Sequence, residues 1–170
     1  MILSDTSILS SFAAAQGLPL LLAALEEDTI FIPPAVEQEL QAGLARSVTY
    51  LQNVLDLIPM GQVQLLDLDE SDLECMTSLP EALGPGEREA IALGLRHGAM
   101  LLCNDLRVVR YCDAQGILCL DLASLLRMLW TKGVATRAKV KTMIVRMERA
   151  ENLVFKDKDR VFAPQKGVPL

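Results

Sequence analysis

The strongest constraint on the fold of this chain is the alternation of short apolar runs with longer segments of helical periodicity. Such alternation is typical of α/β proteins, in which helices connect the strands of a mainly parallel sheet. Five apolar runs have the length of buried strands, at residues 1–4, 29–32, 63–66, 99–103 and 117–120. Helices are predicted at residues 7–25 (broken near 17–19), 34–42, 47–57, from 69, 87–97, 105–115, 121–131 and 136–151.

Length and composition fit one domain. A chain of 170 residues that is 51% apolar can bury a substantial core. We expect residues 1–151 to form this domain. Residues 152–170 alternate charges and end in prolines, so we expect a C-terminal tail or a partner-facing arm there. The chain opens without a basic leader and has no apolar run long enough to span a membrane, so a cytoplasmic protein without membrane contact is expected.

The cysteines and the histidine exclude several kinds of site. The four cysteines contain no CxxC pair, and His97 is the only histidine. A structural zinc site needs four close ligands with recognisable spacing, so buried reduced thiols are the expectation. One histidine also argues against a Ser-His-Asp triad. Enzymatic chemistry in this chain should therefore rest on carboxylates.

Two aspartates occupy the positions where parallel sheets bind ligands. Asp5 follows the first predicted strand and Asp105 follows the fourth. Ligands of α/β proteins bind at the carboxyl ends of the strands, so both carboxylates should emerge into one crevice. The structural alternative is that each Asp caps the helix that follows it.

Helical periodicity adds two glutamates. Glu87 lies on the stripe of its helix that faces the core, where a carboxylate is costly unless it is paired or bound to a metal. The favourable position of an anion at a helix N-terminus is the alternative explanation. In the helix that starts at Pro34, Glu39 faces the same side as apolar residues, but periodicity alone does not choose between Glu39 and Glu37.

Carboxylates that converge from separate elements repel one another, so such a cluster requires a cation. Oxygen ligands without His or Cys favour Mg²⁺ or Mn²⁺ over zinc. One or two of these ions would suit hydrolysis of a phosphodiester bond, because they activate water and neutralise the scissile phosphate.

Charge is divided along the chain. Residues 1–90 carry a net charge of −13 and residues 91–170 a net charge of +7, within a total of −6. The basic half offers a surface for phosphates, whereas a solvated helix face is the structural alternative. Candidate contacts to RNA phosphates are Arg107, Arg110, Arg137, Lys139 and Lys141.

Four motifs in order resemble the PIN-domain family, and in particular its poorly characterised branches. They are ILSDTS at 2–7, IPPAV with EL at 32–36 and 39–40, LGPGE with EAI at 83–87 and 89–91, and LLCND at 101–105. The resemblance spans residues 1 to about 129. It implies a three-layer α/β/α fold with a five-stranded, mainly parallel sheet between helices.

The resemblance also implies a metal-binding acidic quartet at Asp5, Glu39, Glu87 and Asp105, and it favours Glu39 over Glu37. Thr6 or Ser7 would orient the first Asp or a metal-bound water, with Asn104 in support. Two positions depart from the family pattern. Cys103 replaces a common Thr, and valines stand where a further acid often follows the last Asp. Asp121 is a candidate substitute for that acid, or else another N-cap.

Two functions of different classes follow. The first is a Mg²⁺- or Mn²⁺-dependent endoribonuclease with RNA as substrate. The family resemblance extends this expectation to the toxin of a toxin–antitoxin pair, with a small antitoxin as partner and a homodimer as assembly. The second is a catalytically weak PIN-like module that binds a partner protein or nucleic acid. A haloacid-dehalogenase-like phosphohydrolase is disfavoured because Ser7 stands where its second Asp is needed, and no P-loop is present.

Overall fold

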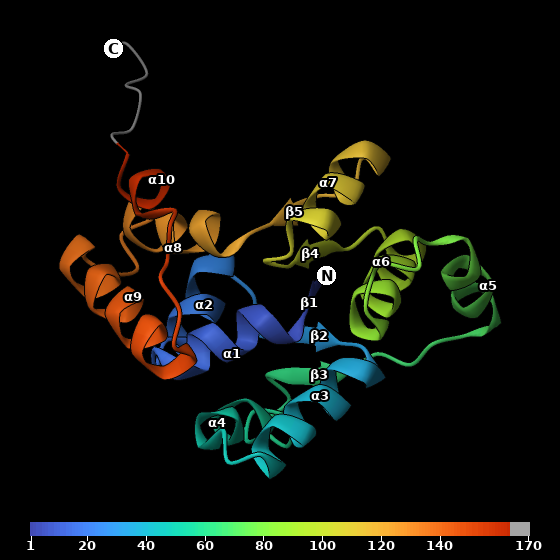
Figure 1. The fold of residues 1–170 in the computed structure, drawn as a ribbon, viewed down its shortest axis with the longest axis horizontal. Coiled ribbons are helices and arrows are strands. Elements are labelled where there is room, and N and C mark those ends of the chain that lie inside the picture. The colour runs from blue at the N-terminus through green and yellow to red at the C-terminus, as the bar shows by residue number, and fades with distance from the viewer. Residues whose placement is uncertain (164–170) are drawn as a thin grey trace.

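The computed structural model describes residues 1–163 and contains one five-stranded parallel sheet (Figure 1). The strand order is β3-β2-β1-β4-β5, and each adjacent pair is parallel. Each connection between strands contains at least one helix, as parallel pairing requires. The strands are β1 (Ile2–Ser4), β2 (Ile30–Ile32), β3 (Val63–Leu65), β4 (Met100–Leu102) and β5 (Cys119–Leu120).

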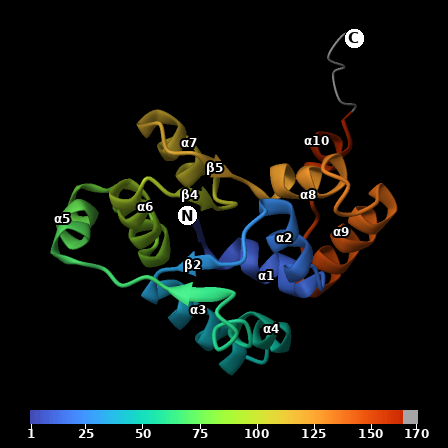
Figure 2. The ribbon, with the colours of Figure 1, turned by 180° about the vertical axis from the view of Figure 1, so that it is seen from behind.

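Helices cover both faces of this sheet, which confirms the predicted three-layer α/β/α fold (Figures 1 and 2). They are α1 (Thr6–Ala14), α2 (Leu18–Leu25), α3 (Pro34–Ala45), α4 (Gln52–Leu55), α5 (Glu70–Ser78), α6 (Pro85–His97), α7 (Leu106–Gln115), α8 (Leu122–Thr131), α9 (Arg137–Glu151) and α10 (Lys158–Phe162), with the 3₁₀ helix η1 (Thr49–Leu51).

The alternation of side chains along the strands divides the core into two clusters. On one face, Ile2, Ile30 and Leu102 pack with residues from α1, α2, α8 and α9. On the other face, Leu3 and Leu101 pack with residues from α6 and α7. Successive residues of a strand point to opposite faces, so each apolar strand fills both layers.

Several helix ends follow the local signals. The break near residues 17–19 separates α1 from α2, and Pro34 and Pro85 stand at the starts of α3 and α6. The segment predicted as one helix over 47–57 is instead η1 followed by the single turn of α4. Leu51 and Val54 are buried there, so packing against the first cluster maintains this irregular segment.

The C-terminal segment differs most from the prediction of a tail or arm that begins at residue 152. Phe155 and Val161 are buried in the first cluster, and the indole Nε1 of Trp130 donates to the carbonyl oxygen of Val161 at 2.8 Å. Arg160 on α10 also pairs with Asp121 at 2.7 Å. The apolar positions between the charges therefore extend the packed structure to residue 163. The rest of the predicted tail, residues 164–170, lies outside the described residues.

Among residues 1–163, no helix combines the length and apolarity that crossing a membrane requires.

Candidate functional site

The candidate site lies at the carboxyl edge of the sheet, where β1 and β4 are neighbours. This is the topological switch point, because the connections from β1 lead to one side of the sheet and those from β4 to the other. The register pairs Ser4 with Leu102, and the Asp5 N–H donates to the Leu102 carbonyl at 3.0 Å. Asp5 and Asp105 thus leave adjacent strands at the same edge.

Asp5 is the most buried acid of the site, with 9% of its surface exposed. Its Oδ1 accepts the Ile8 N–H at 2.9 Å, which caps α1, and the Ser7 hydroxyl donates to its two oxygens at 2.9 and 2.8 Å. Burial raises the pKa of Asp5, against the lowering effect of hydrogen bonds from Cys103, Ile8 and Ser7. Asp5 is therefore both an N-cap and a carboxylate held at an energetic cost that a cation would reduce.

Glu39 reaches the site from α3. The hydroxyl of Thr6 donates to Glu39 Oε2, so the two residues that follow Asp5 have different roles. Ser7 holds Asp5, and Thr6 holds Glu39. Gly86 on α6 permits this approach, because a Cβ at Gly86 would lie 3.3 Å from Glu39 Oε1. Glu37 instead accepts from Gln41 on the same helix at 3.2 Å, and it does not line the pocket.

Glu87 comes from the first turn of α6. Its Oε2 accepts the Gly84 N–H at 2.8 Å, which is one half of a capping box, since Gly84 has no side chain to return the bond. Burial raises the pKa of Glu87, the Gly84 hydrogen bond lowers it, and the negative charges of Asp105 and Asp5 raise it again. Glu87 is therefore an N-terminal helix acid and also an electrostatic neighbour of both aspartates.

Asp105 caps α7 and is bound by an arginine. Its Oδ1 accepts the Arg107 N–H at 2.7 Å, and the guanidinium Nη2 of Arg107 donates to Oδ2 at 2.6 Å. Hydrogen bonds from Arg107 lower the pKa of Asp105 to about 2. Arg107 was predicted as a contact to RNA phosphate, but in the structure its side chain is engaged with the acidic site.

Cys103 lies between the two aspartates. Its Sγ accepts the Asp105 N–H at 3.4 Å, and its thiol is close enough to Asp5 to lower the pKa of that carboxyl. Burial and the charge of Asp5 raise the pKa of the Cys103 thiol, so it stays protonated. A neutral thiol thus stands beside the two aspartates.

Three of the four predicted acids line one pocket of about 330 Å³. Asp5, Glu39 and Glu87 face it together with the hydroxyls of Thr6 and Ser7. The polar side chains of this lining all offer oxygen atoms, which fits the donor preference of Mg²⁺ or Mn²⁺. Within residues 1–163, however, no three acid, Cys or His side chains are already close enough to form a ligand group. Each carboxylate is held separately by Ser7, Thr6, Gly84 or Arg107.

A larger cavity of about 590 Å³ lies at the amino edge of the sheet, away from these acids. Met1, Ile2, Met100 and Leu118 contribute apolar surface to it, and Glu27 is its single acid. Because Glu27 is the only titratable side chain that lines it, the acidic pocket is the better candidate for chemistry.

Asp121 and Asn104 accept hydrogen bonds from the N-terminus of α8. Asp121 Oδ1 accepts the Ser124 N–H at 2.8 Å, and its Oδ2 accepts from Arg160 at 2.7 Å. Asn104 accepts the Leu122 N–H at 3.4 Å. Asp121 does not line the acidic pocket, so the structure shows it as the N-cap of α8.

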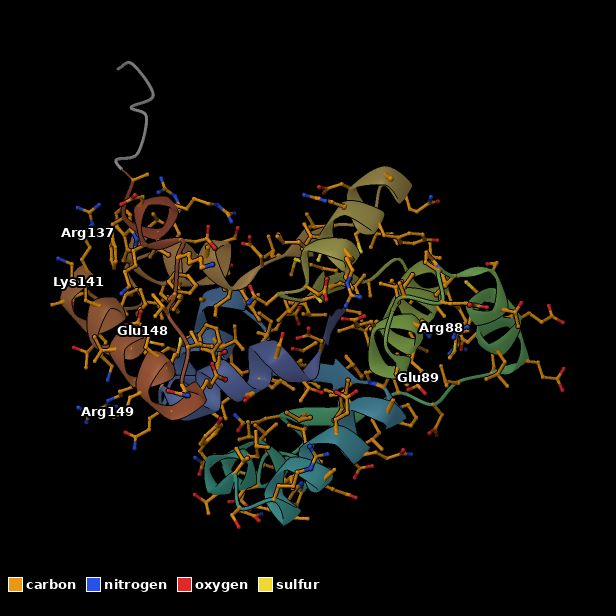
Figure 3. The ribbon with its side chains drawn as sticks, in the orientation of Figure 1. Arg88, Glu89, Arg137, Lys141, Glu148 and Arg149 are labelled. Atoms are coloured by element: carbon orange, nitrogen blue, oxygen red, sulfur yellow. The ribbon has the colours of Figure 1, made fainter. Side chains whose placement is uncertain are left out.

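The other predicted phosphate contacts do not gather at the pocket. Arg110 is exposed on α7, whereas Arg137, Lys139 and Lys141 belong to α9. Figure 3 shows Arg137 and Lys141 at the opposite end of the molecule from Glu89 on α6. The guanidinium of Arg137 lies 4.1 Å from the centre of the Trp130 ring and donates to the Phe162 carbonyl at 2.7 Å.

Two supporting contacts were missed by the sequence reasoning. Glu89 accepts the Ala35 N–H at 2.8 Å and so joins α6 to the start of α3. Ser10, which lines the pocket, donates to Glu151 of α9 at 3.0 Å. No local pattern identifies partners so distant in sequence.

Comparison with known families agrees with this geometry. A family model described as a PIN domain matches residues 1–159. No curated protein and no solved structure was found to match the chain. PIN domains are generally nucleases and typically use divalent metal ions. The family match, the parallel sheet and the acids at its carboxyl edge agree: this chain belongs to a poorly characterised branch of the PIN-domain family.

Proposed function

We propose that the protein is a Mg²⁺- or Mn²⁺-dependent endoribonuclease that hydrolyses RNA phosphodiester bonds. The observation that carries this proposal is the pocket that Asp5, Glu39 and Glu87 share, with Asp105 in the segment that follows the adjacent strand β4. These four carboxylates come from separate elements and lie at the edge where α/β sheets bind ligands. The family match adds that the fold is nuclease-like.

The four acids would hold the metal ion, which when bound supplies an activated water and neutralises charge on the phosphate. Ser7 and Thr6 would keep the carboxylates of Asp5 and Glu39 directed into the pocket through their hydrogen bonds. Cys103, which lowers the pKa of Asp5, would favour the charged carboxylate that a metal ion needs. Negative charge converging on the pocket gives a divalent cation its binding energy, and burial of Asp5 strengthens that attraction.

As part of this proposal, the protein is the toxin of a toxin–antitoxin pair, with a small antitoxin as partner and a homodimer as assembly. Support comes from the family resemblance. Size-exclusion chromatography with light scattering would test the dimer, and a monomer at all concentrations would contradict it.

The test of activity is cleavage of end-labelled RNA in Mn²⁺ or Mg²⁺, compared with a reaction in EDTA. Glu39→Gln should reduce the cleavage rate at least about 100-fold, a loss at the upper end for groups that support a metal site. Glu37→Gln is the matched control, because Glu37 lies on the same helix outside the pocket. Equal rates for the two variants, or cleavage that persists in EDTA, would contradict the proposal.

A second candidate is an interaction module without strong catalysis. The observation that favours it is the neutralisation of Asp105 by Arg107, together with the absence of a ready ligand group among residues 1–163. This alternative predicts no cleavage in Mg²⁺ or Mn²⁺ and tight binding of a partner that Asp5→Asn leaves unchanged.

A further inference from the structure

The guanidinium of Arg107 lies where two acids of the proposed metal site face each other. Its Nε donates to both oxygens of Asp105 at 3.1 Å, and its Nη2 donates to Oδ2 at 2.6 Å. The same Nη2 lies 4.0 Å from Glu87 Oε1. Two carboxylates from different helices therefore share one positive charge.

A backbone acceptor fixes the opposite side of the guanidinium. Arg107 Nη1 donates to the Ala82 carbonyl at 2.7 Å, in the segment between α5 and α6. An arginine at the surface usually lacks such a set of partners and contributes little to stability. Arg110, one turn further along α7, is exposed and offers a direct comparison.

We infer that Arg107 is an internal counter-cation that a divalent metal ion must displace from Asp105 before the site is complete. This inference rests on the proposed metal site. The oxygens with which Asp105 accepts hydrogen bonds from Arg107 are the same oxygens that it would offer to a metal ion. Displacement costs the guanidinium its hydrogen bonds to Asp105, so the apparent affinity for metal falls by that amount.

The consequence is that half-occupancy of the site requires a higher metal concentration. With Arg107 in place, the acids at the carboxyl edge are partly neutralised and the protein tolerates their proximity without an ion. A bound ion would replace the guanidinium and recruit Asp105. Arg107, which the sequence predicted as a contact to RNA phosphate, thus competes with the metal ion for Asp105.

The test measures Mn²⁺ affinity by titration calorimetry or by the electron paramagnetic resonance signal of free Mn²⁺. Arg107→Gln should bind Mn²⁺ about fivefold more tightly than the wild type, the magnitude expected for loss of a partly exposed ion pair. Arg107→Lys keeps the charge but loses the planar fork, so its affinity should lie between the two. Arg110→Gln is the control and should stay within about twofold of the wild type.

A second readout does not depend on activity. Without metal, Arg107→Gln should melt at a lower temperature than the wild type, because Asp105 and Glu87 then repel each other. Saturating Mn²⁺ should raise its melting temperature by more than it raises that of the wild type. Mn²⁺ affinity of Arg107→Gln equal to or weaker than that of the wild type would overturn the inference.

The failures of the two proposals are distinguishable. If Asp105→Asn abolishes Mn²⁺ binding while Arg107→Gln leaves it unchanged, the inference fails and the metal site stands. If Arg107→Gln tightens binding but no variant cleaves RNA, the counter-cation stands and the nuclease proposal fails. If neither the wild-type protein nor Arg107→Gln shows Mn²⁺ binding that depends on Asp105, the inference and the proposed metal site are both wrong.

Discussion

The ends of β4 and β5 have the same local design but different surroundings. Asp105 and Asp121 each cap the helix that follows their strand, and each pairs with an arginine. Asp105 pairs with Arg107 of its own helix and lies beside Glu87. Asp121 pairs with Arg160 of α10, from the C-terminal segment.

An N-capping aspartate becomes a candidate metal ligand only through its neighbours. The side chain of Asp105 is 27% exposed and that of Asp121 is 13% exposed, so burial alone does not separate them. What separates them is position in the sheet: β4 lies beside β1 and its acids, whereas β5 is an edge strand. Asp5 is the third aspartate that follows a strand and caps a helix. Like Asp105, it lies close enough to Glu87 to raise the pKa of that acid.

The largest expected effect is on cleavage. Asp105→Asn should reduce metal-dependent RNA cleavage at least about 100-fold. Asp121→Asn should stay within about twofold of the wild-type rate, because its remaining oxygen still accepts the Ser124 N–H. Rates would be measured at saturating Mn²⁺, with circular dichroism to confirm the fold. Equal losses of cleavage rate in the two variants would place Asp121 in the metal site and contradict the distinction between Asp105 as a ligand and Asp121 as a helix cap.

The next effect is on stability, and it concerns Asp121. Asp121→Ala should lower the free energy of unfolding by about 1–2 kcal/mol, because it removes an N-cap worth about 1 kcal/mol and an ion pair worth less than that. Urea unfolding followed by circular dichroism measures it. Asp159→Ala, an exposed acid of α10, is the control and should change stability by no more than about 0.5 kcal/mol. A loss no larger than that of the control would show that the Arg160 contact does not anchor the C-terminal segment.

The smallest expected effect is a dependence of stability on pH, measured without metal. Burial raises the pKa of Asp5 in the folded state, so the folded protein binds the proton more tightly than the unfolded chain does. The wild type should therefore lose stability relative to Asp5→Asn as pH rises above the unfolded pKa of about 3.9 and through the raised folded value.

Asp105 should show the opposite sign in the same experiment. Its folded pKa is lowered to about 2 by Arg107, so its carboxylate stabilises the fold above the unfolded pKa of about 3.9. That contribution is lost as pH falls through the folded value. Asp105→Asn should thus be less stable than the wild type at neutral pH and equal to it in strong acid. If Asp5→Asn and Asp105→Asn changed the pH dependence of stability in the same direction, the surroundings assigned to Asp5 and Asp105 would be contradicted.

Much of the fold was predictable because its signals are local. Apolar runs identified all five strands, and prolines and glycines identified most helix boundaries. The segment around residues 47–57 and the C-terminal helix α10 were not predicted, because long-range packing of Leu51, Val54 and Val161 determines them. Val161 follows a run of charged residues in the sequence, so the pattern did not predict its burial.

The candidate site was predictable only in outline. Strand ends and helix periodicity selected Asp5, Glu87 and Asp105, but the choice of Glu39 over Glu37 needed the family resemblance. In the structure the Thr6 hydroxyl and the small Gly86 bring Glu39 to the pocket. The role of Arg107 was not predictable, since a helix arginine near a cap is ordinarily a surface charge.

Local sequence patterns establish the order of strands and helices and place aspartates after three strands, because periodicity and capping act over a few residues. Which of those aspartates share an electrostatic field depends on the packed fold, since the field depends on distances between segments far apart along the chain. For this protein, the adjacency of β1 and β4 makes Asp105 a candidate metal ligand, and docking of α10 makes Asp121 a structural cap.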